Sequence, residues 1–194
     1  MLNTILGTLS SGVAASTSSY ESIASATGTG SSGTISFTSI PSTYSHLQIR
    51  YIGKENTTAS AFARNIYIQF NSDTGATSYA YHELLGNGSI VSANGSSNQN
   101  AIFLSDAIPS SHSTLTNVIG VGLIDIHDYA STTKNKTLRT IYGSDANISS
   151  TDYQINLRSG VWLSTSAINR IDIKTSSGNY TTASTFALYG IKGA

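Results

Sequence analysis

The chain has 194 residues, with 10 acidic and 10 basic side chains, so its formal net charge at pH 7 is zero. Charged residues make up only 10% of the sequence, against about 25% in an average soluble domain. This argues against a nucleic-acid binder, which needs lysines and arginines to neutralise phosphates, and against a protein held at a membrane surface by charge.

Residues 1–19 are rich in Ser, Thr, Ala and Gly, and we expect them to form a flexible arm outside the folded domain. Leu2, Ile5, Leu6 and Leu9 are spaced as on one face of a short amphipathic turn. The arm is either a mobile leader or a segment that docks on a neighbouring subunit. In the second case these four residues are the candidate partner-binding residues. This stretch lacks a basic region, so we do not interpret it as a signal peptide.

From residue 20 onwards the sequence alternates apolar and polar side chains with the period of two that is typical of half-buried strands. Gly, Asn and Ser turns separate the alternating segments. The expected strands cover residues 34–39, 46–52, 65–71, 79–85, 90–93, 101–104, 118–128, 137–144, 154–163, 168–174 and 185–193.

Four of these segments carry more specific expectations. Residues 118–128 are the most apolar run, which predicts a central strand buried on both faces at its start. Gly160 predicts a bulge within 154–163, and residues 96–100 resemble an exposed loop tip. In the last strand, residues 185–193, Phe186 and Leu188 alternate with smaller or more polar neighbours, which indicates that it completes a sheet.

No segment after residue 20 predicts a helix longer than one turn, and no run approaches the roughly 20 apolar residues of a membrane span. About ten strands joined by short polar turns predict an all-β fold, an antiparallel β-sandwich resembling a jelly roll. We expect residues 20–194 to form a single domain.

Candidate catalytic groups are few. The absence of cysteine excludes thiolate metal sites and cysteine nucleophiles. Asp125 and His127 point to one face of the expected strand, where an imidazole–carboxylate pair or half a metal site is geometrically possible. The glycine-rich segment 28–33 precedes a strand, so it lacks the helix N-terminus that a phosphate-binding loop needs. We therefore expect a non-enzymatic protein without catalytic residues, metal or cofactor, and a metal-assisted hydrolase using Asp125 and His127 remains an alternative.

Aromatic residues are frequent, with 11 tyrosines and one tryptophan. Tyr79 and Tyr81 share one face of an expected strand and form a possible aromatic contact for sugar rings or a partner protein. The alternative is that the tyrosines lie at the edges of the sandwich while Trp162 lies in the core.

Several segments, read together, resemble a widespread family of virion structural proteins of tailed bacteriophages. The resemblance extends from about residue 20 to the end of the chain. Its most specific parts are residues 40–50 (IPSTYSHLQIR) and 186–193 (FALYGIKG), and residues 20–24, 124–129 and 159–162 contribute the rest. The resemblance implies a β-sandwich subunit on the virion surface.

Within that class we expect a head decoration, or cement, protein. Such a subunit would sit on the capsid surface as a homotrimer and bind the major capsid protein, which stabilises the head. The alternative is a tail-fibre or baseplate module that binds host carbohydrate through tyrosine-lined loops.

Overall fold

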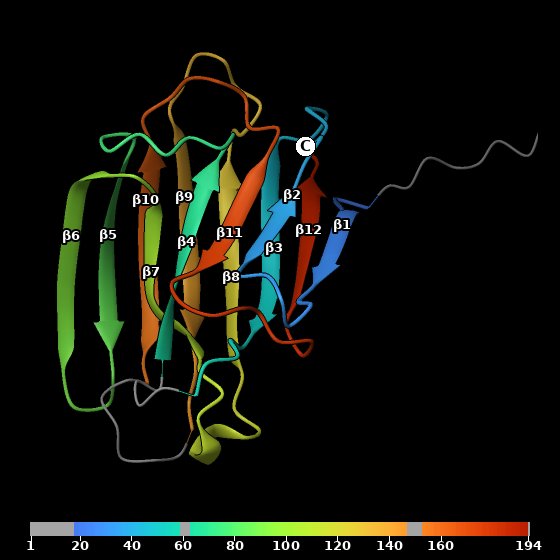
Figure 1. Cartoon of the computed structure of the whole chain (residues 1–194). Helices are drawn as coiled ribbons and strands as arrows, with labels where there is room; N and C mark the ends of the chain where they lie inside the picture. Colours follow the sequence, from blue (N-terminus) through green and yellow to red (C-terminus); the bar gives the residue numbers. More distant parts are fainter. Residues whose placement is uncertain (1–17, 59–62, 147–152, 194) are drawn as a thin grey trace, which may run out of the picture.

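The computed structural model describes residues 18–58, 63–146 and 153–193, and these residues form an all-β fold (Figure 1). They contain twelve strands and one turn of 3-10 helix, η1 (Ser113–Leu115). The strands are β1 (Tyr20–Thr27), β2 (Thr34–Phe37), β3 (His46–Gly53), β4 (Ala63–Phe70), β5 (Tyr79–Gly86), β6 (Val91–Gln99), β7 (Ile102–Pro109), β8 (Gly120–His127), β9 (Lys136–Gly143), β10 (Ile155–Trp162), β11 (Ile171–Thr175) and β12 (Thr185–Ile191).

The strands form two antiparallel sheets that pack face to face, which confirms the predicted antiparallel sandwich. The larger sheet has the order β1-β12-β3-β8-β9-β10-β5-β6, and the smaller has the order β2-β11-β4-β7. Figure 1 shows the four-stranded sheet in front of the larger one. Consecutive pairs of strands alternate between the sheets. β1 pairs with β12 and β3 with β8 in the larger sheet, whereas β2 pairs with β11 and β4 with β7 in the smaller sheet. Such paired alternation between two sheets is typical of a jelly roll.

The core lies between the sheets and is formed by the inward side chains of both. Phe186 of β12 stacks on Tyr51 of β3, with ring centroids 5.6 Å apart. Phe70 of β4 packs on Trp162 of β10, with ring centroids 5.7 Å apart. Each pair fixes large rings that would be costly to leave in water.

The closing strand has the orientation that its sequence predicted. β12 lies between β1 and β3, and Phe186 and Leu188 are completely buried. The chain therefore completes the larger sheet with one of its last segments.

Three local expectations were wrong. β8 is central, but Val121 near its start is exposed, because none of the described strands covers the outer side of the larger sheet. Gly160 pairs in regular register with Tyr81 and Leu138, so it forms no bulge. A Cβ at Gly160 would lie 2.8 Å from Ile102 of the facing sheet, and the glycine therefore allows the two sheets to pack closely.

The polar stretch expected to be a loop tip instead continues β6, which extends to Gln99. Its backbone groups are paired with β5, and this ladder compensates for the low strand propensity of Asn, Ser and Gly. Among the residues that the structure describes, no helix has the length and apolar character needed to cross a membrane.

Candidate interaction surface

The outer side of the eight-stranded sheet, which faces away from the smaller sheet, carries an unusual number of large apolar side chains. Antiparallel register arranges them in two rows across the strands. In the first row Leu123, Ile141, Leu157 and Leu84 are successive cross-strand partners from β8 to β5. In the second row Ile52 pairs directly with Val121. Gly143 then lies between Val121 and Ile155, and Gly86 lies between Ile155 and Val91. We call these eight apolar residues the apolar face.

The apolar face is exposed as far as the described residues are concerned. Ile141 is 49% exposed, Leu157 54%, Val121 55% and Ile155 62%. Isolated exposed apolar residues are common on proteins, but a contiguous set on neighbouring strands indicates a site of interaction. Covering such a set would remove substantial apolar area from water, which is the dominant favourable contribution to most associations.

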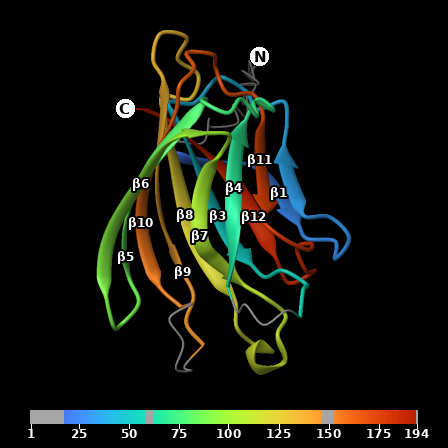
Figure 2. The same cartoon turned by 60° about the vertical axis from the view of Figure 1, so that its left-hand side comes forward.

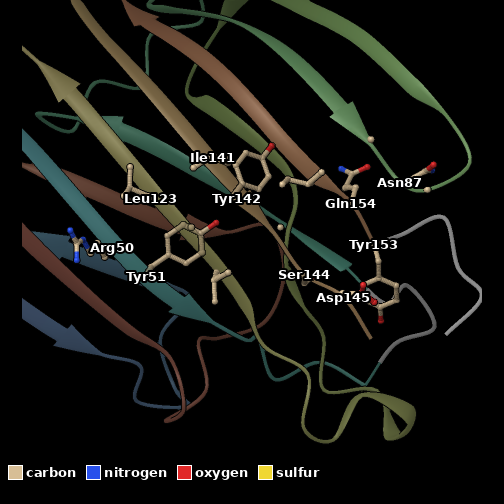
Figure 3. A pocket seen from close by; sticks show the side chains of 16 residues that line it. Arg50, Tyr51, Asn87, Leu123, Ile141, Tyr142, Ser144, Asp145, Tyr153 and Gln154 are labelled. Atoms are coloured by element: carbon tan, nitrogen blue, oxygen red, sulfur yellow. The ribbon is translucent and has the colours of Figure 1, made fainter. Parts of the chain in front are cut away.

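A groove of about 860 Å³ is lined by four residues of the apolar face, Val121, Leu123, Ile141 and Ile155, together with polar residues and tyrosines of the neighbouring segments (Figure 3). Gly143 stands between Val121 and Ile155 in the cross-strand row, and Gly86 follows Ile155. Gly86 leaves the row hollow, because a Cβ built there would meet no atom within 4 Å, whereas a Cβ at Gly143 would lie 2.4 Å from the Gln154 carbonyl oxygen. The charged side chains among the described lining residues are Arg50 and Asp145.

The phase of β10 explains why apolar residues face outward. Its sequence alternates Ile155 and Leu157 with Asn156 and Arg158, so one pair must face the core. Gly160 and Trp162 face inward further along the strand, and the period of two then turns Asn156 and Arg158 inward as well. The two apolar residues are consequently left on the outer side.

Arg158 is tolerated inside because several groups surround its guanidinium. It forms an ion pair with Glu83 of β5, and its Nη2 donates to Ser105 Oγ at 3.1 Å. The guanidinium also lies over the Tyr81 ring, 4.6 Å from the centroid. Ser105 belongs to the smaller sheet, so this buried cluster joins the two sheets below the apolar face.

The other half of the outer side is polar. Gln48 Nε2 donates to Asp125 Oδ1 at 2.8 Å, and Arg50 Nε donates to Gln48 Oε1 at 2.9 Å. The Arg50 guanidinium lies over the rings of Tyr20 and Tyr189, 5.9 and 5.5 Å from their centroids. These contacts hold the side chains in a fixed network across β1, β12, β3 and β8.

Asp125 and His127 lie on the same outer face of β8, as the sequence predicted, but each is engaged with other residues. Asp125 accepts the hydrogen bond from Gln48, and His127 Nε2 lies 3.3 Å from an Arg139 nitrogen. Burial, helped by Arg139 and by His46, lowers the pKa of His127. No group of three or more potential metal ligands occurs among the described residues.

Tyr79 and Tyr81 share one strand face, but that face is the inner one. Tyr79 is completely buried, and its hydroxyl donates to the Asp73 carbonyl oxygen at 3.1 Å. Tyr81 is half-buried against Arg158. The expectation that Tyr79 presents an accessible aromatic contact is therefore wrong, because its ring forms part of the sandwich core.

The other candidate contact residues, Leu2, Ile5, Leu6 and Leu9, lie outside the described residues. The sequence reasoning did not identify the apolar face, although a signal for it was present. In β10, Asn156 and Arg158 share a strand face with Trp162, so a core position for Trp162 implies that Ile155 and Leu157 face outward. The chain matches no protein-family model and no curated protein.

Proposed function

We propose that the protein is a non-enzymatic structural subunit of a tailed-bacteriophage virion, a capsid decoration protein that binds the major capsid protein. The observation that carries the proposal is the apolar face, because a chain with so few charges exposes seven of the eight large apolar side chains of this face and partly exposes the eighth, Leu123. Such a surface fits permanent attachment to another protein better than brief encounters with partners in solution. The resemblance of residues 20–193 to virion proteins supplies the setting.

The proposed attachment places the apolar face against the capsid surface. The polar half, with its network around Gln48 and Arg50, would remain at the solvent-accessible rim of the contact. Interfaces combine an apolar centre with a polar rim in this way. We further propose that the subunits act as homotrimers over junctions between capsomers.

The first test is the copy number of the protein per purified virion, measured by quantitative mass spectrometry against the major capsid protein. Hundreds of copies would place it on the head. A small multiple of three or six would place it in the tail and contradict the decoration role.

The second test compares two variants in the phage that encodes the protein. Leu157→Asp puts a charge in the apolar face, and Ser159→Asp puts the same charge two residues further along the same outer side. We expect Leu157→Asp to abolish incorporation into particles and Ser159→Asp to preserve it, because burying an unpaired carboxylate costs several kcal/mol. Equal incorporation of both variants would contradict attachment through the apolar face.

The second candidate function is a tail-fibre or baseplate module that binds host carbohydrate. Its aromatic platform would be Tyr20, which is 44% exposed, together with Tyr189 on the polar half of the outer side. Glycan-array binding that Tyr20→Ala abolishes would favour this function, and its absence would remove it.

A further inference from the structure

We propose that residues 2–9 occupy the groove of the apolar face in their own molecule and cover this face until a partner replaces them. Three independent properties point to this occupant: its chemistry, its spacing of apolar side chains, and the reach of the intervening chain. The docking itself does not depend on the proposed capsid role. Only the replacement by a partner rests on that proposed function.

The chemistry of the segment matches the groove. Residues 1–17 contain no Asp, Glu, Lys or Arg. The described groove residues include two charged side chains. Arg50 belongs to β3, and Asp145 lies just after the end of β9. A segment without charged side chains enters such a groove without the desolvation penalty that a buried charge would carry.

The spacing of apolar residues fits a groove rather than a flat contact. Leu2, Ile5, Leu6 and Leu9 stand at positions i, i+3, i+4 and i+7, the pattern of a single apolar stripe. A stripe of this kind laid in a hydrophobic groove is a common mode of peptide recognition. The open position at Gly86, between Ile155 and Val91, offers the depth that branched side chains need.

The chain is long enough for the segment to reach its own groove. Tyr20 begins β1, and β9 lies four strands away in the sheet order, a separation of about 19 Å at about 4.8 Å per strand. Tyr20 lies in the same cross-strand row as Thr137 of β9, and Ile141 lies about 13 Å further along that strand. The direct path from Tyr20 to Ile141 is therefore about 23 Å.

The structure describes Ser18 and Ser19 beside β1, where the Ser19 carbonyl oxygen accepts a hydrogen bond from Lys192 N. The free linker is therefore residues 10–17, which reach at most about 28 Å and have a root-mean-square span of about 16 Å, so a largely extended linker reaches the groove. A tethered segment that reaches its site has an effective concentration in the millimolar range. At micromolar protein concentration this favours the molecule's own segment over that of a neighbour.

The experiment uses the absence of cysteine from the chain. One full-length variant combines Leu6→Cys with Ile141→Cys, and the matched control combines Leu6→Cys with Thr137→Cys. Ile141 and Thr137 are both exposed on the outer side of β9, so either substitution leaves the core intact. The two variants thus differ only in whether the second thiol lies in the apolar face or in the polar half.

Under mild oxidation we expect an intramolecular disulfide at 141 to form at least about tenfold faster than at 137, because a disulfide requires Cα atoms within about 7 Å. The bond is read from mobility on non-reducing gels and from peptide mass spectrometry. Equal rates at the two positions would overturn the proposal. Disulfide-linked dimers in place of the intramolecular product would also overturn it and assign the segment to a second copy.

A second measurement avoids cysteine altogether. Leu6→Asp places a charge in the stripe, whereas Thr8→Asp places one beside it. If residues 2–9 cover the groove, Leu6→Asp should raise the fluorescence of the hydrophobic dye ANS several-fold and Thr8→Asp should not. No difference between the two variants would overturn the proposal, whereas a failure of virion incorporation tests only the proposed function.

Discussion

Leu157 of β10 and Ile141 of β9 are direct cross-strand partners on the outer side of the larger sheet, and both are about half exposed. In most sandwiches the outer partners of such a pair are polar, because water covers them. Here the pair is the centre of an apolar surface that extends to neighbouring strands on both sides. The contact between Leu157 and Ile141 therefore stabilises the pairing of β10 with β9 and also lies at the centre of the apolar face.

The first prediction concerns this pair in solution. In a Leu6→Asp background, which uncovers the apolar face, replacing Leu157 and Ile141 together by Asp should reduce self-association in sedimentation velocity, since it breaks the apolar surface. The free energy of unfolding should fall by no more than about 1 kcal/mol for each exposed site, part of it from repulsion between the facing carboxylates. Unchanged self-association in that background would contradict an interaction through the apolar face.

The second prediction contrasts two glycines of the larger sheet. Gly86→Val should leave the free energy of unfolding unchanged or raise it by about 0.5 kcal/mol, because a Cβ there meets no atom and strand entropy improves. Gly122→Ala should lower it by about 1–3 kcal/mol, because the new Cβ would lie 2.4 Å from the buried Tyr51 ring. Denaturant unfolding of both variants measures the difference, and equal stabilities would contradict the described packing.

The fold was largely predictable because it depends on local alternation. Residues 185–193 specify β12 by their pattern, and the polar turns separate the segments. The antiparallel sandwich arrangement followed from spacing, although the sequence predicted about ten strands and the described residues contain twelve. Pairing between distant strands, such as β1 with β12, carries no local signal and could not be derived.

The candidate surface was not predictable, because a period of two defines two faces without stating which one is buried. In β10 the inward direction of Asn156 and Arg158 is decided by Gly160, which contacts Ile102 of the other sheet. Glu83, on β5, then compensates the buried charge of Arg158. These partners are tens of residues apart, so the exposure of Leu157 emerges only when the sheets are assembled.

The third prediction concerns the single tryptophan. Trp162 Nε1 donates to Asp73 Oδ2 at 2.7 Å, and Asp73 Oδ1 accepts from Gly75 N and Ser78 Oγ. Asp73→Ala should lower the free energy of unfolding by about 1–3 kcal/mol, since it leaves the buried indole N–H without its acceptor. Tryptophan fluorescence during denaturant unfolding measures this loss, and Thr74→Ala at the exposed neighbouring position is the control.

The same carboxylate gives a pH dependence. Burial raises the pKa of Asp73, but the hydrogen bonds from Trp162, Gly75 and Ser78 outweigh burial and hold the pKa below its ordinary value of 3.8. The stabilisation is therefore present above pH 3.8 and is lost as the pH falls through the lowered pKa. Asp73→Ala should remove this acid-dependent loss, and an unchanged acid profile would contradict the assignment.

The fourth prediction concerns His127 at mildly acidic pH. Burial and the neighbouring Arg139 and His46 lower its pKa from the ordinary 6.5, although Asp125 and Asp128 act in the opposite direction. The unfolded chain then binds a proton more readily than the folded protein, so stability falls as the pH drops below about 6.5 and levels off below the folded-state pKa.

Replacing His127 by Gln should therefore reduce the loss of stability between pH 7 and pH 5, as measured by thermal or denaturant unfolding across that range. Thr137→Ala, at the exposed cross-strand partner of His127 on β9, is the matched control and should leave the slope close to that of the original protein, because it removes no titratable group. The physical reason for the difference is local: His127 lies between a guanidinium and a second imidazole, which oppose its protonation in the folded state. Identical slopes for the two variants would show that these neighbours do not control the titration of His127.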